Sequence, residues 1–211
     1  STDPEKVIRN GGPSREWRAV SFGAMVGRQW RAFRLQGQRR SFESDTMSIP
    51  DDNELRQLAE ALGARLRASH HRLVTAESCT GGWIAKAVTD IAGSSDWFDC
   101  GMAAYSYEAK QALLGVRPQT LEVHGAVSRE TVIEMVSGAL VNSGASIAVA
   151  VTGIAGPGGG SEDKPVGTVW IGWKRRGGYA KAEVFTFDGD REAVRRQTVA
   201  AALLGLDATI G

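Results

Sequence analysis

Cysteine is scarce in this 211-residue sequence, and long apolar runs are absent. The two cysteines, Cys79 and Cys100, are too few for a disulfide framework and lack the C-x-x-C spacing of a metal site. Proteins of reducing compartments use cysteine in this way, so we expect a cytoplasmic location. Because no apolar run approaches the ~20 residues that a membrane-spanning helix requires, we expect no membrane as a partner.

Net charge is also nearly absent, at +1 for the whole chain at pH 7. The hydrophobic share of 42% and the charged share of 23% are ordinary for a globular protein, which argues against general disorder. The charge is uneven, because residues 1–46 hold nine Lys/Arg and five Asp/Glu and leave the remainder net negative. That remainder has no basic stripe with interleaved aromatic residues, so we expect no nucleic acid as a partner.

Residues 1–46 show no sustained helical or strand periodicity and no apolar segment typical of a secretory signal. We interpret them as a poorly ordered basic leader, or as an extension upstream of the true start, with Met47 as a candidate first residue. An arm that binds nucleic acid or a membrane is the alternative. Residues 47–211 are long enough to form one domain with its own core.

Helices and strands are predicted to alternate from residue 47 onward. Residues 147–151 form an apolar run without polar alternation, which is typical of a strand covered on both faces. The last two strands flank a turn at residues 175–178 and predict a hairpin. This order predicts an α/β fold, a three-layer α/β/α sandwich with a mixed, mostly parallel sheet. Helices are expected at residues 51–69, 80–91, 108–114, 128–142 and 191–204, and strands at 72–76, 98–106, 146–152, 166–173 and 180–187.

The segment TAESCTGG, at residues 75–82, places a small nucleophile where a strand meets a helix. Ser78 is expected beside free N–H groups at the start of that helix, which stabilise a developing negative charge. A serine that only caps the helix is the alternative. Cys79 is the rival nucleophile, but no histidine stands in a recognisable motif with it, and we interpret it as a small buried residue.

A serine nucleophile requires a base, and a lysine can serve if burial keeps it neutral. Lys110 ends the segment YSYEAK at a second strand-to-helix junction, where the sheet topology can bring it to Ser78; a solvated surface lysine is the alternative. Lys86 is too far, since its place on the helix after Ser78 puts it roughly 12 Å along the axis. Lys164 completes an S-x-x-K string, but that motif requires a helical turn and here lies in a Gly/Pro loop.

A glycine-rich segment, residues 152–160, follows the apolar strand. Its spacing fits neither a P-loop nor a G-x-G-x-x-G turn, yet its backbone N–H groups can cradle a phosphate or a carboxylate. A flexible surface loop is the alternative. Arg191, Arg195 and Arg196 open the last helix and suit bidentate phosphate recognition, although a solvated helix face explains at least one of them.

Together these segments resemble the C-terminal domain of the competence/damage-inducible protein CinA, a family that includes the nicotinamide-nucleotide amidases. The resemblance spans about residues 50–207, and its combined motifs are far more specific than any single one. The larger upstream domain of full-length CinA proteins is not expected within residues 1–46. The matching segments are AESCTGG (76–82), YSYEAK (105–110), LGV (114–116), HGAVS (124–128), TGIAGPGGGSEDKPVGTV (152–169) and GDR (189–191).

The resemblance implies an α/β/α fold, commonly in a homodimer. It implies hydrolysis of the carboxamide of nicotinamide mononucleotide to nicotinate mononucleotide and ammonia, a salvage step for pyridine nucleotides, without a metal ion or another cofactor. By motif, the family's nucleophile falls on Ser78 and its base on Lys110. Its catalytic threonine falls on Thr152 and its active-site tyrosine on Tyr105.

In the predicted mechanism, neutral Lys110 takes the Ser78 proton and Thr152 hydrogen-bonds within this pair. Glu108 is expected to point away from Lys110, because a nearby carboxylate would keep the amine charged. N–H groups near Cys79, Thr80 and Gly81 are expected to hold the oxyanion. The phosphate is expected on the backbone of Gly156, Gly158, Gly159 and Gly160 and on Arg191 and Arg195.

Two positions depart from the family's pattern, since Tyr107 stands where asparagine is usual and His124 where tyrosine is usual. The exact substrate is therefore left open. The alternatives are a non-catalytic nucleotide-binding module that uses the same glycine-rich segment, and an amidohydrolase that acts on another small amide.

Overall fold

A computed structural model describes residues 49–210, so the leader predicted at residues 1–46 lies outside the described residues. The described part contains a five-stranded mixed sheet with the order β2-β1-β3-β4-β5. β1 is parallel to both β2 and β3, whereas β4 is antiparallel to β3 and to β5. Four strands of this described sheet therefore share one direction. The strands are β1 (Leu73–Glu77), β2 (Phe98–Ala103), β3 (Ile147–Gly153), β4 (Thr168–Arg175) and β5 (Lys181–Thr186).

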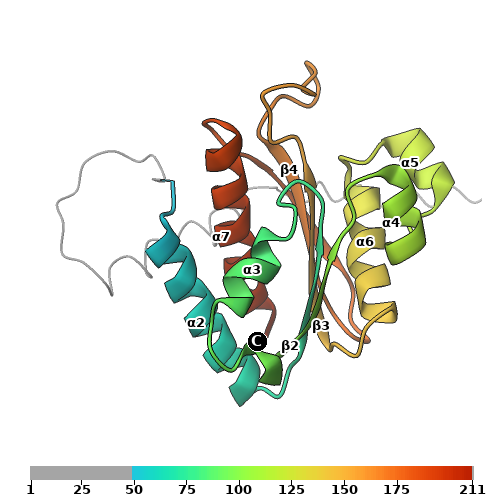
Figure 1. Ribbon diagram of the computed structural model, residues 1–211. Helices are drawn as coiled ribbons and strands as arrows, with labels where there is room; N and C mark the ends of the chain where they lie inside the picture. The colour runs from blue at the N-terminus through green and yellow to red at the C-terminus, as the bar shows by residue number, and fades with distance from the viewer. Residues whose placement is uncertain (1–48, 211) are drawn as a thin grey trace, which may run out of the picture.

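Helices cover both faces of the sheet, as Figure 1 shows. α2, α3 and α7 lie on one face, and α4, α5 and α6 lie on the other. This arrangement confirms the predicted three-layer α/β/α fold. The helices of the described residues are α2 (Asp52–Ala68), α3 (Trp83–Thr89), α4 (Tyr107–Leu114), α5 (Pro118–His124), α6 (Arg129–Val141) and α7 (Arg191–Ile210), with a 3₁₀ turn η1 (Ser94–Asp96).

Two helices differ from the sequence prediction. The prediction missed α5, which begins at Pro118, a position where the helix requires no N–H donor. α7 continues past the predicted end at residue 204, because Leu206 and Ile210 are buried in the core. Gly205 does not stop this helix; a Cβ there would lie 2.3 Å from the Trp173 ring, so the glycine permits close packing of β4 against α7.

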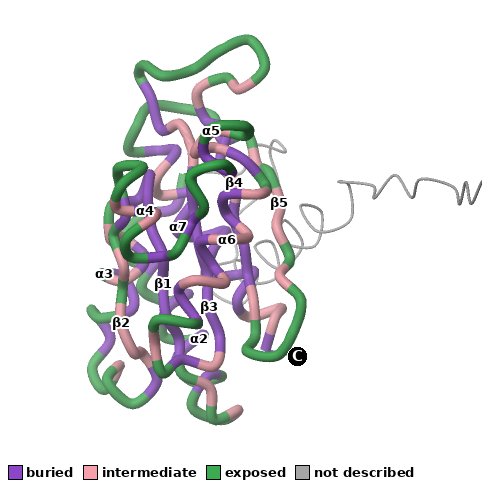
Figure 2. Tube along the Cα trace, turned by 90° about the vertical axis from the view of Figure 1, so that its right-hand side faces the viewer, coloured by how far each residue is buried: buried purple, intermediate pink, exposed green. Residues whose placement is uncertain are grey.

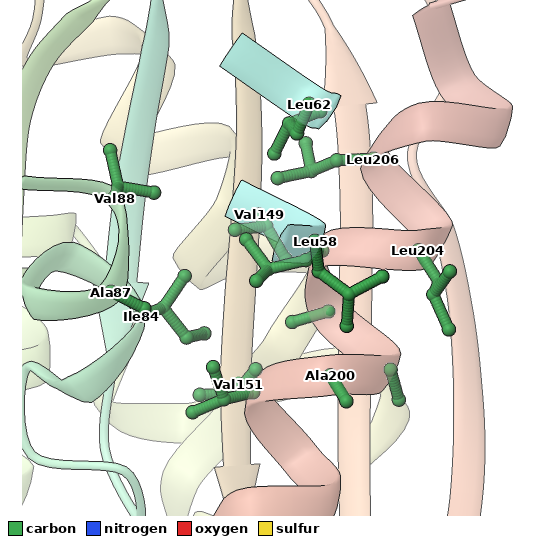
Figure 3. Close-up of a cluster of buried hydrophobic side chains, with 14 of the residues drawn as sticks. Leu58, Leu62, Ile84, Ala87, Val88, Val149, Val151, Ala200, Leu204 and Leu206 are labelled. Carbon is green, nitrogen blue, oxygen red and sulfur yellow. The ribbon is translucent and has the colours of Figure 1, made fainter. Parts of the chain in front are cut away.

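Two apolar clusters fill the spaces between the sheet and the helices. β3 separates them, because Val149 and Val151 belong to one cluster and Ala148 and Ala150 to the other. This explains the apolar run without polar alternation, and Figure 2 shows β3 buried along most of its length while the edge strand β5 is partly exposed. The cluster drawn in Figure 3 includes Leu58, Leu62, Ile84, Ala87, Val88, Val149, Val151, Ala200, Leu204 and Leu206.

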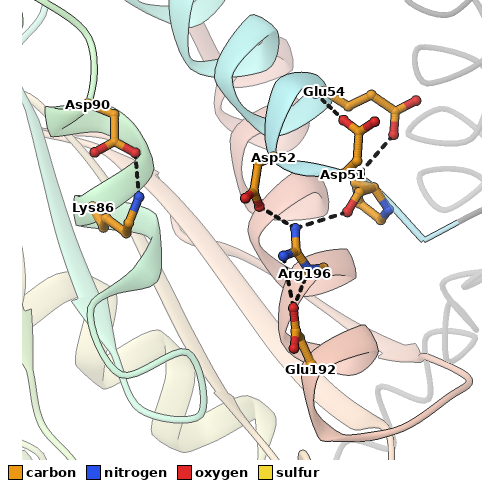
Figure 4. A network of polar contacts seen from close by, with 8 residues as sticks. Asp51, Asp52, Glu54, Lys86, Asp90, Glu192 and Arg196 are labelled. Carbon is orange, nitrogen blue, oxygen red and sulfur yellow. Dashed lines mark hydrogen bonds and ion pairs between the residues drawn. The ribbon is translucent and has the colours of Figure 1, made fainter.

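A polar network joins the start of α2 to α7 (Figure 4). Asp51 and Glu54 form a capping box, in which Glu54 N donates to Asp51 Oδ1 at 2.8 Å and Asp51 N donates to Glu54 Oε2 at 3.0 Å. Arg196 on α7 pairs with Asp52 on α2 and with Glu192 on its own helix. These ion pairs engage Arg196 in joining the two helices, so its predicted role in binding phosphate is not supported.

The position of α4 depends on its close approach to α6. An ideal Cβ at Gly138 would lie 1.7 Å from the carbonyl oxygen of Leu114, and Asn142 donates to the carbonyl of Leu113 at 3.0 Å. The last turn of α4 therefore rests directly on the backbone of α6. Because α4 carries Lys110, this contact also sets the position of a candidate catalytic residue.

The substitution Gly138→Ala is expected to lower the free energy of unfolding, because the added methyl group would overlap the Leu114 carbonyl. Overpacking of this kind costs about 1–3 kcal/mol, and it opposes the gain of about 1 kcal/mol that alanine brings to a helix interior. Urea denaturation measures the difference. The control is Gly178→Ala, where the Cβ would lie at an ordinary 3.4 Å from its nearest neighbour. Equal stabilities of the two variants would contradict the role given to Gly138.

Candidate active site

Ser78 lies at the carboxyl end of β1, on the face of the sheet that α4 covers. Its N–H donates to the Val151 carbonyl at 3.0 Å, so the pairing of β1 with β3 continues for one residue beyond the strand. Side chains alternate along a strand, and Ser78 therefore shares a face with Val74 and Ala76, which pack in the cluster beneath α4 and α6. Its side chain is buried, with 8% of the residue exposed.

Lys110 reaches this serine from the first turns of α4. Its Nζ lies 3.0 Å from Ser78 Oγ, and it donates to the carbonyl oxygens of Ala104 at 2.9 Å and Tyr105 at 3.1 Å. Only 1% of Lys110 is exposed. The structure thus brings the predicted nucleophile and the predicted base together, with the amine held by the backbone that follows β2.

Burial lowers the pKa of Lys110 from its usual value of 10.5. A weaker effect from Cys79 acts in the opposite direction, and no carboxylate contributes. Glu108 lies on the exposed side of α4, where hydrogen bonds from its own backbone and from Ser106 lower the pKa of its carboxyl group. The amine can therefore lose its proton at a lower pH than a solvated lysine.

The three acceptors around Lys110 suit both of its protonation states. A charged ammonium group donates one N–H to each of them. When the amine is neutral, the Ala104 and Tyr105 carbonyls still accept its two N–H groups. Its lone pair then points toward the Ser78 hydroxyl and can accept that proton.

Cys79 is unsuited to the role of nucleophile. Burial is the main cause that raises the pKa of its thiol, to about 12, so the reactive thiolate form is rare at neutral pH. The side chain belongs to the apolar cluster on the α3 side of the sheet. The site therefore favours Ser78 over its neighbour.

The N–H groups at the start of α3 are not free, which corrects the sequence prediction. Glu77, which is 1% exposed, accepts hydrogen bonds from Gly82 N at 3.1 Å, Ile84 N at 2.9 Å and Ala85 N at 2.8 Å. Gly81 N donates to the Ser78 carbonyl at 3.0 Å and is therefore also engaged.

Two predicted oxyanion donors remain available. Among the described residues, the N–H groups of Cys79 and Thr80 donate to no other residue. Both directly follow Ser78 in the chain, and they lie in the turn that leads to α3. Sequence reasoning missed Glu77, although a carboxylate at the end of an otherwise apolar strand was a signal for a buried helix cap.

Thr152 lies on the strand next to Ser78 but does not hydrogen-bond to the Ser78–Lys110 pair. Its Oγ1 donates to the Ala126 carbonyl at 2.8 Å, because β3 directs this side chain toward the segment between α5 and α6. Ala126 N donates in turn to the Tyr107 hydroxyl at 3.3 Å. The predicted bond within the pair is therefore wrong for this structure, and Thr152 and Tyr107 together hold the backbone of Ala126 beside the site.

Arg191 connects the glycine-rich loop to the end of β2. Its Nη1 donates to the Gly156 carbonyl at 2.8 Å and its Nη2 to the Tyr105 hydroxyl at 3.2 Å. The Tyr105 side chain is exposed, and its carbonyl is one of the two that hold Lys110. Arg191 and Tyr105 therefore lie beside the backbone that holds Lys110.

The tip of the glycine-rich loop projects beyond the sheet at the top of Figure 1. Its exposed glycines are Gly158, Gly159 and Gly160. No hydrogen bond joins these three to Ser78 or Lys110 in the described part of the chain. Within residues 49–210, Gly156 is the one predicted loop glycine that hydrogen-bonds to Arg191.

The two other candidate lysines take part in different contacts. Lys86 pairs with Asp90 one turn along α3, as Figure 4 shows. Lys164 donates from its Nζ to the His124 carbonyl at 3.2 Å, and its backbone N–H donates to Ser161 Oγ in an exposed turn. Neither contacts Ser78, so both lysines are excluded as its base in agreement with the sequence analysis.

Arg195 lies behind the turn that follows Ser78. Its Nη2 donates to the Thr80 carbonyl at 2.7 Å, and its guanidinium stacks 4.9 Å from the centre of the Trp83 ring. A groove of 410 Å³ passes over this ring on the α2–α3–α7 side, and Ser78 does not line it. Its walls come from the side of β1 opposite to Lys110. The groove is lined by Asp52, Trp83, Lys86, Arg191, Glu192, Arg195 and Arg196.

Residues 49–210 include no helix that is both long enough and apolar enough to cross a membrane. The same residues bring no three His, Cys, Asp or Glu side chains together as ligands for a metal ion.

Comparison with known proteins gives a consistent result. The family model of the CinA C-terminal domain matches residues 55–210. The chain is 55% identical over 152 residues to the nicotinamide-nucleotide amidohydrolase PncC of Escherichia coli K12, covering 72% of this chain and 92% of that protein. It is 47% identical over 149 residues to a CinA-like protein of Akkermansia muciniphila, of which it covers 36%. The crystal structure of the competence/damage-inducible protein CihA from Agrobacterium tumefaciens is similar with a TM-score of 0.72 and 46% identity, over 77% of this chain and 98% of that one.

The substitution Thr152→Val is expected to lower the free energy of unfolding by about 0.5–1.5 kcal/mol, because it removes the hydrogen bond to the part-buried Ala126 carbonyl. Thr152→Ser retains the hydroxyl and is expected to stay close to the parent. Chemical denaturation measures both. If Thr152→Val is as stable as the parent but slower in catalysis, the hydroxyl serves in proton transfer rather than in holding this wall.

Proposed function

The chain belongs to the CinA C-terminal domain family, and we propose that it hydrolyses the carboxamide of nicotinamide mononucleotide to nicotinate mononucleotide and ammonia. The observation that carries this proposal is the buried Lys110 amine, 3.0 Å from the Ser78 hydroxyl. A neutral lysine in that position is the base that an attacking serine needs. The relatives named nicotinamide-nucleotide amidohydrolase, with 55% identity over nearly their whole length, support an amidase with a nicotinamide nucleotide as its substrate.

Acylation begins when the Lys110 lone pair takes the Ser78 proton and Oγ bonds to the amide carbon. The carbonyl oxygen becomes an oxyanion, which accepts from the N–H groups of Cys79 and Thr80, the two residues that directly follow Ser78. Loss of one such donor in other enzymes costs about 10²–10³ in rate. The C–N bond then breaks, ammonia leaves with the proton that Lys110 returns, and an ester remains on Ser78.

Deacylation uses the same groups. Lys110 takes a proton from water, the hydroxide oxygen bonds to the ester carbon, and the bond to Ser78 Oγ breaks. The serine regains its proton from Lys110, and the acid product leaves. Both halves of the reaction require a neutral amine at their start, which the burial of Lys110 favours.

The phosphate of the mononucleotide requires cationic and N–H donors near the Ser78–Lys110 pair. Arg191 is the best placed, since it already bridges the Gly156 carbonyl and the Tyr105 hydroxyl. The exposed backbone of residues 158–160 provides further donors, whereas Arg195 lies on the opposite side of β1, where it holds the Thr80 carbonyl and stacks on Trp83. The homodimer and the leader at residues 1–46 stay as proposals drawn from the sequence.

The first test measures ammonia released from nicotinamide mononucleotide by the parent protein and by two variants. Ser78→Ala should lower turnover at least about 10³-fold because it removes the nucleophile, whereas Cys79→Ala should retain most of it. Circular dichroism controls for folding. Binding of the mononucleotide without ammonia release by the parent would indicate a binding module. Faster release of ammonia from another small amide would identify that amide as the preferred substrate. An active Ser78→Ala variant would exclude Ser78 as the nucleophile.

The pH dependence of kcat/KM tests the base. Below the pKa of Lys110 the amine is protonated and cannot accept the Ser78 proton, and above that pKa it can. Because burial lowers this pKa, we expect kcat/KM to rise with pH through a midpoint below 10.5. Lys110→Arg keeps the positive charge at every accessible pH and should be inactive throughout. If Lys110→Arg is active and its kcat/KM shows the same dependence on pH, the rise of kcat/KM with pH belongs to another group.

A further inference from the structure

Glu77 is a buried acidic residue to which the mechanism so far gives no role. It is the last residue of β1 and directly precedes Ser78. Its side chain points to the face of the sheet opposite to that of Ser78, toward α3. Five donors converge on its two carboxylate oxygens, at distances from 2.6 to 3.1 Å. A carboxylate with this many short hydrogen bonds is one of the most firmly held groups in a protein.

The five donors belong to three successive parts of the chain. Thr75 Oγ1 donates from within β1 at 3.1 Å, whereas Thr80 Oγ1 donates from the turn after Ser78 at 2.6 Å. The other three are the N–H groups of Gly82, Ile84 and Ala85, at the start of α3. The carboxylate therefore fastens both the turn that follows the nucleophile and the helix that follows the turn.

This arrangement fixes which N–H groups stay free. The turn bends through Gly81 at φ +62° and Gly82 at φ +96°, a conformation that glycine adopts without strain. With Gly82 N engaged by Glu77 and Gly81 N engaged by the Ser78 carbonyl, the donors left beside Ser78 are those of Cys79 and Thr80. Glu77 thus determines the shape of the turn on which the oxyanion donors lie.

We propose that Glu77 is a positioning residue for hydrolysis, which sets the Ser78–Gly82 turn so that the N–H groups of Cys79 and Thr80 meet the oxyanion. This inference rests on the proposed function and adds a residue to it. It differs from an ordinary helix cap in one respect. A cap stabilises the fold alone, whereas a positioning residue also affects the rate of the chemical step, because a displacement of about 1 Å can cost 10²-fold in rate.

The direct variant, Glu77→Gln, presents an amide NH₂ to donors and can fail to fold. The chain offers a gentler, matched pair. Thr75→Val and Thr80→Val are nearly isosteric, both side chains are fully buried, and each removes one hydroxyl bond to Glu77. Only Thr80 lies in the turn. Both variants are therefore expected to show a similar fall in Tm.

Their kinetics are expected to differ. Thr80→Val should lower kcat for nicotinamide mononucleotide at least about tenfold, with KM changed less than about twofold, because only the chemical step uses the turn. Thr75→Val should keep kcat within about twofold of the parent, and Thr80→Ser, which restores the hydroxyl, should recover toward it. Equal kcat values for both valine variants would overturn the inference and leave Glu77 as a structural cap.

A second readout separates this inference from the proposed function. Amide hydrogen exchange of Gly82 and Ile84, followed by NMR, should be at least about tenfold faster in Thr80→Val than in Thr75→Val. This measurement requires no substrate. If the parent releases no ammonia, the proposed function fails, and the exchange rates still decide whether Glu77 holds the turn. If exchange is the same in both variants, the inference fails even where the parent is active.

Discussion

The amine of Lys110 has to be buried and hydrogen-bonded at the same time, and much of the domain is arranged around that constraint. A charged ammonium group in an apolar interior is costly, and the cost falls when the group is neutral or when acceptors surround it. The backbone after β2 supplies two carbonyl acceptors, those of Ala104 and Tyr105. Ser106 then caps α4, so the helix begins directly after these carbonyls and places the Lys110 amine against them. Gly138 then allows α4 to lie close against α6. Parallel pairing of β1 with β2 brings the serine to the same edge of the sheet.

The alternation of side chains along β1 separates two tasks that would otherwise conflict. Glu77 is a carboxylate one residue from the nucleophile, and on the same face it would stabilise the charged form of Lys110. On the opposite face, its oxygens are saturated by five donors, and no carboxylate contributes to the pKa of Lys110. One strand end can therefore hold an acid that organises the turn and a serine that must meet a neutral base.

The fold could be predicted because it depends on strong local signals, whereas the choice of Lys110 as the partner of Ser78 depended on the resemblance to the family. The apolar run at residues 147–151 and the strand-to-helix junctions fix the sheet, and topology then brings the junctions together. The hydrogen-bond partners of individual N–H and hydroxyl groups could not be predicted in this way. Whether an N–H at the start of α3 is free depends on where Glu77 points, and whether Thr152 meets Lys110 depends on the segment that packs beside β3. Such contacts join residues that are distant in the sequence and leave no periodic pattern.

The segment at residues 124–128 forms a wall beside the Ser78–Lys110 pair and is held by residues outside that pair. The Tyr107 hydroxyl accepts from Ala126 N, and Thr152 donates to the carbonyl of the same residue. The His124 carbonyl accepts from Lys164 Nζ. This wall is therefore held by α4, by β3 and by the loop before β4, whereas the 3.0 Å contact of Ser78 with Lys110 is supported by the carbonyls of Ala104 and Tyr105. Because the two sets of hydrogen bonds share no atom, a substitution at Tyr107 that shifts the wall leaves the hydrogen bonds of Lys110 in place.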